Sequence, residues 1–153
     1  MKKLLLVVAG IGFATYYFGS KKVTEIKGVV DKLKLNVNGI RDLKISSGGL
    51  KFNIDLNIQN PTSQNLDLNT AQVVTLSKLK FFAKNGDFLG ESFPNLTNIQ
   101  IPANGSVNIP NLETFVKVSN FGNLLNNVLQ LFSNPSNLKV SAELSALGQT
   151  YTI

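Results

Sequence analysis

The stretch Leu50–Gln59, with the sequence LKFNIDLNIQ, decides the fold class of this 153-residue chain. Its apolar residues occupy every second position, and they are Leu50, Phe52, Ile54, Leu56 and Ile58. A period of two is typical of a β-strand with one buried face. Asn60-Pro61 follows directly, and we expect the strand to end there because Pro61 has no amide hydrogen to donate to a neighbouring strand.

Shorter stretches on both sides repeat this alternation. Before it, Leu33, Leu35 and Val37 alternate with polar residues. After it, strand candidates lie at residues 73–76, 79–83, 88–89, 99–101, 107–109, 138–144 and 151–153. The segment Lys84-Asn85-Gly86-Asp87 separates two of them, and its Asn-Gly pair predicts a β-hairpin with a type I′ turn. The sequence therefore predicts a mainly β, antiparallel sandwich or flattened barrel.

A helical period replaces the alternation between Ser119 and Pro135. Apolar residues there recur at intervals of three or four, which predicts an amphipathic helix late in the chain. Its apolar face comprises Phe121, Leu124, Leu125, Val128, Leu129 and Phe132. We expect this face to cover the core of the sandwich. The alternatives are contact with a bilayer or one wall of a groove for an apolar ligand.

The first 22 residues predict a membrane anchor. An uncharged run, Leu4–Ser20, lies between Lys2 and Lys3 on one side and Lys21 and Lys22 on the other. Its length is close to the about 20 residues that a spanning helix needs. The residues expected inside the bilayer are Leu4, Leu5, Leu6, Val7, Val8, Ile11, Phe13, Tyr16, Tyr17 and Phe18. We expect the four lysines to contact lipid headgroups. The alternative is a secretory signal cleaved near Ala14.

The chain is thus predicted to have three parts: the anchor at residues 1–22, a juxtamembrane connector at residues 23–28 and a β domain at residues 29–153. Such a chain would be a single-pass membrane protein. Lysines lie on both sides of the apolar run, so the distribution of positive charge does not decide which side holds the domain. A cell envelope and the membrane of a lipid-containing virus particle both remain open.

Charge and residue types exclude several functions. The net charge is +6, but four of the 15 basic residues flank the apolar run, and a nucleic-acid-binding surface needs a denser basic face. The chain has no histidine and no cysteine, which are the commonest partners of a catalytic nucleophile and of a metal. The neighbours Ser77 and Lys78 would point to opposite faces of a strand. We expect no enzymatic activity, no cofactor, no metal and no nucleic-acid partner.

Four features occur in a recognisable order beyond Gly28. They are the Leu50–Ile58 strand followed by Asn60-Pro61, the Asn85-Gly86 turn, the segment Ile101–Ser106 before an apolar stretch, and the late helix with Leu124-Leu125. This order resembles the LEA-2 family of late embryogenesis abundant proteins, which includes the water-stress and hypersensitive-response (WHy) domain. The chain departs from the family at Thr62, where members often have a second asparagine.

The resemblance implies a non-enzymatic sandwich similar to fibronectin type III domains, often tethered to a membrane or acting near one. Our leading hypothesis is a membrane-anchored structural or binding protein that presents this sandwich beside a bilayer. Its expected partners are the lipid bilayer and other protein subunits, for example in a virion or an envelope complex. The alternatives are an apolar-ligand (lipid) carrier and a stress-protective envelope protein.

Overall fold

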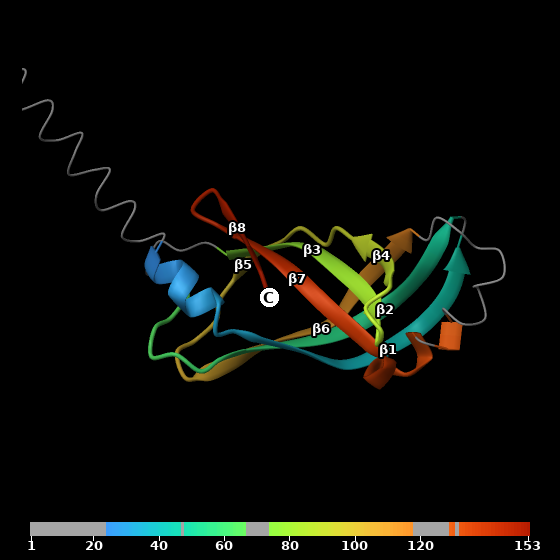
Figure 1. Ribbon diagram of the computed structural model, residues 1–153, viewed down its shortest axis with the longest axis horizontal. Coiled ribbons are helices and arrows are strands. Elements are labelled where there is room, and N and C mark those ends of the chain that lie inside the picture. Colours follow the sequence, from blue (N-terminus) through green and yellow to red (C-terminus); the bar gives the residue numbers. More distant parts are fainter. Residues whose placement is uncertain (1–23, 47, 67–73, 118–128, 131) are drawn as a thin grey trace, which may run out of the picture.

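The computed structural model describes residues 24–46, 48–66, 74–117, 129–130 and 132–153. Within these ranges the chain is mainly β-structure, as the sequence predicted, and every strand pairing is antiparallel (Figure 1). The strands are β1 (Lys34–Ser46), β2 (Gly49–Asn60), β3 (Val74–Ala83), β4 (Phe88–Ser92), β5 (Leu96–Ile99), β6 (Gly105–Lys117), β7 (Leu138–Ala146) and β8 (Gln149–Thr152). A short 3-10 helix, η2 (Pro135–Asn137), precedes β7.

The strands form two sheets that face each other. One sheet has the order β1-β2-β6, and the other has the order β4-β3-β7-β8, with β5 also paired to β3. Buried side chains from both sheets meet in one core. Phe52 of β2 and Phe81 of β3 are in edge-to-face contact across this core, with ring centroids 5.7 Å apart. The arrangement is a β-sandwich.

Strand β2 confirms the pattern of the Leu50–Gln59 stretch. All five of its apolar side chains are buried, at 1% exposure or less. The strand ends at Asn60, whose side chain is itself buried. Asn60 Oδ1 accepts hydrogen bonds from the Thr62 amide (3.0 Å) and hydroxyl (2.7 Å), while Nδ2 donates to Gln64 O (2.7 Å). These bonds turn the chain away from the sheet at Pro61.

The β3–β4 hairpin forms where the sequence predicted it, but the type I′ turn was wrong. A type I′ turn needs positive φ at both central residues. Here Gly86 has a φ of 98°, whereas Asn85 does not have a positive φ. Gly86 N donates to Ala83 O (2.9 Å), so Lys84 and Asn85 form the turn and Gly86 follows as a bulge. The Asn85 side chain accepts from Asp87 N (3.1 Å) and stabilises this alternative.

Strands β3, β4 and β6 are longer than the sequence indicated, and bulges hide the continuity of β3 and β6. In β3, a register shift between Leu76 and Lys78 joins two stretches that look separate in the sequence. Strand β6 continues beyond Ile109 through Pro110 and Asn111, although proline cannot donate to a ladder. Proline is tolerated there because β6 lies at the edge of its sheet.

Residues 24–30 are helical, and they belong to the domain. Ile26, Val29, Val30 and Leu33 are buried in the core. The spacing of Ile26, Val29 and Val30 places them on one face of the helix, and Leu33 follows just beyond its end. Part of the segment predicted as a connector therefore packs inside the domain, and the first strand starts at Lys34 rather than near Val29.

In the described part of the chain, no helix combines the length and apolar character needed to cross a membrane. The predicted anchor, residues 1–22, lies outside that part. The late helix is described only at its end, where residues 129–130 and 132–133 are helical. Phe121, Leu124, Leu125 and Val128 lie outside the described residues. Of the predicted apolar face, Phe132 is fully buried and Leu129 packs partly buried against the core.

Candidate functional site

One end of the sandwich gathers segments from four parts of the sequence, and we call it the N-terminal end. It consists of residues 24–33, the loops 61–66 and 100–104, and the β7–β8 turn at Leu147 and Gly148 (Figure 1). The two loops are bonded to each other, since Asn104 N donates to Thr62 O (2.8 Å) and Ala103 N donates to Asn65 Oδ1 (2.7 Å). Leu66 and Ile101 exchange two backbone hydrogen bonds beside them. These loops form a fixed surface.

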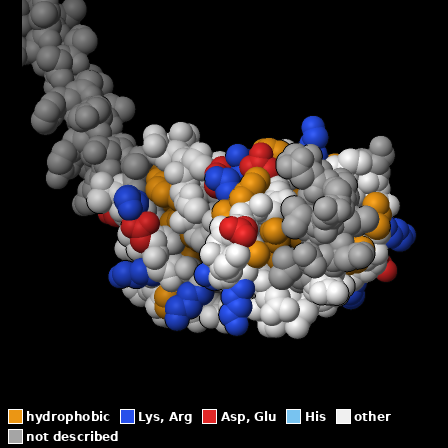
Figure 2. Space-filling view, turned by 45° about the vertical axis from the view of Figure 1, so that its right-hand side comes forward, with side chains coloured by type: hydrophobic (Ala, Val, Ile, Leu, Met, Phe, Trp, Pro, Cys, Tyr) orange, Lys and Arg blue, Asp and Glu red, His pale blue; other side chains and the backbone are white. Residues whose placement is uncertain are grey.

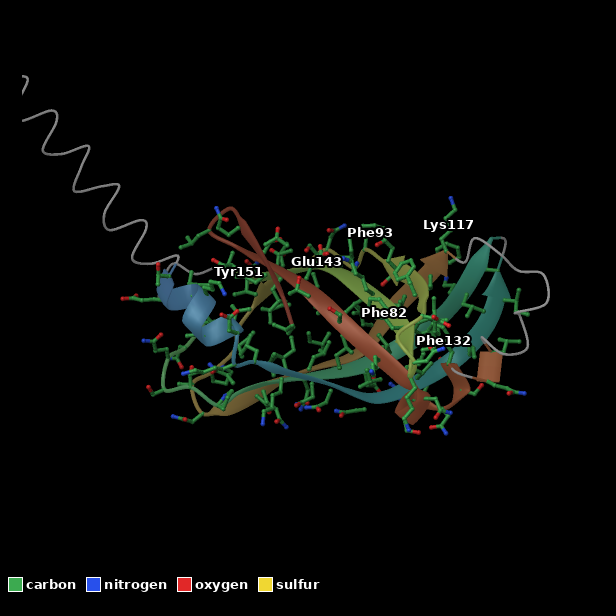
Figure 3. The ribbon with its side chains drawn as sticks, viewed as in Figure 1. Phe82, Phe93, Lys117, Phe132, Glu143 and Tyr151 are labelled. Atoms are coloured by element: carbon green, nitrogen blue, oxygen red, sulfur yellow. The ribbon has the colours of Figure 1, made fainter. Side chains whose placement is uncertain are left out.

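The helix 24–30 is held against this end by burial of its apolar face. Tyr151 of β8 lies at the same end in Figure 3, and its side chain is buried. Its hydroxyl has no hydrogen-bond partner among the described residues. Burial raises the pKa of Tyr151, Lys27 lowers it and Asp31 raises it, and burial is the largest of these effects. On the exposed side of the helix, Lys27 Nζ lies 2.6 Å from Asp31 Oδ2.

The loop residues that the structure describes at the N-terminal end carry no charge. Residues 61–66, 100–106 and 147–150 include no aspartate, glutamate, lysine or arginine. Leu147, at the tip of the β7–β8 turn, is 42% exposed. The charges nearby in sequence are Glu25, Lys27, Asp31, Lys32, Lys34 and Asp67, in which lysines and acids are equal in number. A polar hollow of about 400 Å³ opens at this end, with Lys34, Asn60 and Ser106 among its lining residues.

A second feature is a charge network on the outer face of the five-stranded sheet. Lys80 Nζ lies 2.8 Å from Glu143 Oε1, and Lys78 Nζ lies 3.7 Å from Glu91 and 3.9 Å from Glu143. The hydrogen bond from Lys80 lowers the pKa of Glu143, and the same bond raises the pKa of Lys80. Figure 3 shows Glu143 on β7, midway along the sandwich.

The neighbours Ser77 and Lys78 both make contacts in this part of the sheet. Ser77 Oγ donates to the backbone oxygen of Glu143 (3.0 Å) and accepts from Ser145 Oγ (3.4 Å). The Lys78 ammonium lies between the carboxylates of Glu91 and Glu143. The arrangement stabilises the sheet through paired charges.

Sequence reasoning missed the role of Asp55. Its Oδ1 accepts from Arg41 Nη2 (2.8 Å) on β1 and from the Asn111 backbone amide (2.6 Å) on β6. Asn111 has a positive φ of 56°, which marks the bulge in β6. A carboxylate on the central strand thus fixes both edge strands of the three-stranded sheet. Its only signal in the sequence is an acidic residue at the centre of the Leu50–Gln59 stretch.

An aromatic hollow lies between the β4–β5 connection and β6. Its volume is about 450 Å³, and Phe93 and Phe115 at its rim are 58% and 43% exposed. The Lys78 ammonium lies 5.2 Å from the centroid of the Phe93 ring. Ser92 lines the hollow, and its buried hydroxyl has no hydrogen-bond partner among the described residues.

Some of the site residues predicted from the sequence lie in the core, and the others lie outside the residues that the structure describes. The anchor residues and Lys2, Lys3, Lys21 and Lys22 lie outside it. Phe132 joins Phe52 and Phe81 in an aromatic cluster, with ring centroids 5.1 and 5.5 Å away.

On the face drawn in Figure 2, basic and acidic side chains are interspersed in small groups. Within the described residues, no group of three acidic side chains is placed to hold a metal ion.

Comparison with known proteins assigns no family. No family model matches the chain, and no curated protein matches it. Among solved structures, the chain is similar to one described as "Crystal structure of protein from Archaeoglobus fulgidus". The similarity covers 80% of this chain and 90% of that chain at 8% sequence identity, with a TM-score of 0.31. At that TM-score the similarity carries no argument about the fold or the function.

Proposed function

We propose that this protein is a single-pass membrane protein that presents a non-enzymatic β-sandwich directly beside a bilayer. The domain acts as a structural or binding module, and its resemblance to LEA-2 domains extends to a fibronectin-III-like arrangement with a late amphipathic helix. The residues Leu4–Ser20 form the membrane helix in this proposal. Lys21 and Lys22 lie at the headgroups.

The observation that carries the proposal is the position of Ile26. It is buried in the domain core only four residues beyond Lys22. Four residues span at most about 14 Å when extended and about 6 Å in a helix. A domain attached so closely to an anchor stays at the membrane surface, because the chain between them is too short to let the domain move away.

The carrier alternative receives less support from the packing. A lipid carrier needs an open space between the sheets and the late helix. Phe52, Phe81 and Phe132 occupy that region, with ring centroids 5.1 to 5.7 Å apart. Such distances are those of packed aromatic rings.

Insertion is tested by placing a charge in the apolar run. We expect Val8→Lys to move the full-length protein from the carbonate-resistant membrane fraction to the soluble fraction, since a lysine at a helix centre opposes insertion by about 2.5 to 3.5 kcal/mol. Asn36→Lys adds the same charge at an exposed position of β1 and serves as the control. Equal retention of both variants would mean that the run does not hold the protein in the membrane.

A role as a subunit of a larger assembly is favoured by the aromatic hollow. Phe93 and Phe115 are more exposed than large apolar side chains usually are, and aromatic residues are enriched at protein interfaces. Crosslinking in native membranes or particles tests this role. Stoichiometric crosslinks from Lys78 or Lys117 to one repeated neighbour support it, and crosslinks to lipid alone contradict it.

A further inference from the structure

We propose that the N-terminal end of the sandwich is a lipid-contacting surface and that the domain stands end-on upon the bilayer. The loops 61–65 and 102–105 and the turn at Leu147 touch the headgroup region in this arrangement. The inference rests on the proposed function, because it assumes that the chain is anchored through residues 1–22. It adds an orientation and a set of contacting residues that the anchor alone does not specify.

The first support is the rigid attachment of the chain at this end. The helix 24–30 buries Ile26, Val29 and Val30, so its direction is fixed relative to the sheets. The Lys27–Asp31 ion pair lies on its exposed side. In the proposed arrangement the anchor precedes this helix by only one or two residues of the chain, so the end that carries the helix is the one nearest the bilayer.

The second support is the chemistry of the loops beside that helix. Their described residues are uncharged, and an uncharged polar segment approaches the headgroup region at a much lower desolvation cost than a charged one. Leu147 adds an exposed apolar side chain at the tip of a turn. Its φ of 49° and the φ of 72° at Gly148 keep the turn tight, so the side chain projects from a fixed position.

The third support is the position of the lysines around these loops. Lys32 and Lys34 are exposed, and Lys34 lines the polar hollow beside Asn60 and Ser106. Lysine side chains next to uncharged loops suit a surface that carries phosphate groups. A protein partner is a different occupant, and the experiment below uses vesicles without other proteins to separate the two.

The test uses the absence of native cysteine, which makes every introduced cysteine a unique labelling site. Ser63→Cys and Gln149→Cys place a fluorophore at the N-terminal end, and Lys84→Cys places it at the β3–β4 turn. The full chain is reconstituted in vesicles of equimolar phosphatidylcholine and phosphatidylglycerol. A nitroxide on the lipid headgroup quenches fluorophores that touch the surface. The ends of β2 are about 40 Å apart, so only one end can reach the nitroxide when the domain stands upright.

We expect several-fold stronger quenching at Ser63 and Gln149 than at Lys84. Equal quenching at all three positions would mean that the sandwich lies flat, and it would overturn the inference. Unquenched labels at Ser63 and Gln149 on protein that still floats with the vesicles would also overturn it, while leaving the anchor intact. Failure to float would instead contradict the proposed function, so the two failures are distinguishable.

A matched pair of charge variants provides a second test of the contact surface. Ser63→Glu puts a negative charge on the proposed contact surface, and Lys84→Glu puts one at the far turn. On the anionic vesicles we expect Ser63→Glu to lower the quenching at Gln149 about two-fold or more, because like charges repel. Lys84→Glu should leave it unchanged. Equal effects of the two variants would overturn the inference.

Discussion

Different structural elements cover the core at the two ends of this sandwich. At the N-terminal end, the helix 24–30 covers the core, and uncharged loops surround it. At the opposite end, the aromatic cluster of Phe52, Phe81 and Phe132 fills the space between the sheets. Lys117 and Phe132 lie toward that end in Figure 3. A short helix and loops therefore cover the core at one end, whereas packed aromatic rings fill it at the other.

The largest effect is expected at the aromatic end. Phe132→Ala should lower the free energy of unfolding by about 3 to 5 kcal/mol, because it removes a fully buried ring that contacts two others. Chemical denaturation of the full chain in detergent measures this change. Phe93→Ala is the matched control and should cost within about 0.5 kcal/mol, since Phe93 is 58% exposed. Similar losses in both variants would mean that Phe132 does not belong to the core.

The helix at the N-terminal end should be the next most sensitive element. Ile26→Ala is expected to cost about 2 to 5 kcal/mol by the same measurement, because the side chain is 1% exposed. Lys27→Ala, one position along, removes only an exposed ion pair and should cost about 0.5 kcal/mol or less. If the two variants were equally stable, the helix would not be part of the domain, and the two ends would no longer differ as described.

Between the two ends, Asp55 should give an intermediate effect. Asp55→Ala leaves the Asn111 amide and the Arg41 guanidinium without their common acceptor, and we expect a loss of about 1 to 3 kcal/mol. Hydrogen exchange at Asn111 provides a second measurement, and its amide should exchange faster in the variant. Glu113→Gln is the control, because Glu113 pairs with Lys51 at the exposed surface. Unchanged exchange at Asn111 would contradict the role assigned to Asp55.

The smallest effect concerns pH. The hydrogen bond from Lys80 holds the pKa of Glu143 below its ordinary value of 4.5. Because the folded state favours the ionised carboxylate, Glu143 contributes stability above pH 4.5 that is lost as the pH falls through the lowered pKa. Glu143→Gln should therefore show a shallower loss of stability on acidification than the wild type in a thermal unfolding series. An identical acid dependence would show that this pair contributes nothing measurable.

Much of the sandwich could be predicted from local sequence patterns. The Leu50–Gln59 stretch identified the central strand β2, and the Asn85-Gly86 pair located the β3–β4 hairpin. Both predictions depend only on residues that are close together in the sequence. The pairing of β2 with β6 links residues that are far apart in the sequence, from Asn60 with Gly105 to Gly49 with Lys117, and no local pattern encodes that choice. Bulges at Ser77 and Asn111 further hid two strands by shifting the alternation.

The candidate site was less predictable than the fold. The helix 24–30 has a helical spacing at Ile26, Val29, Val30 and Leu33 that was readable from the sequence, but its position directly after the apolar run made it resemble a connector. The uncharged character of the loops 61–66 and 100–106 was equally visible. Only the folded arrangement brings them together, through hydrogen bonds such as Asn104 N to Thr62 O.

The most direct test of the central claim is carbonate extraction of the native membranes followed by intact-mass measurement of the retained protein. Our account predicts that the protein resists extraction and that its mass includes residues 1–22. A protein released into the soluble fraction, or one whose mass shows cleavage near Ala14, would contradict a retained anchor beside the sandwich.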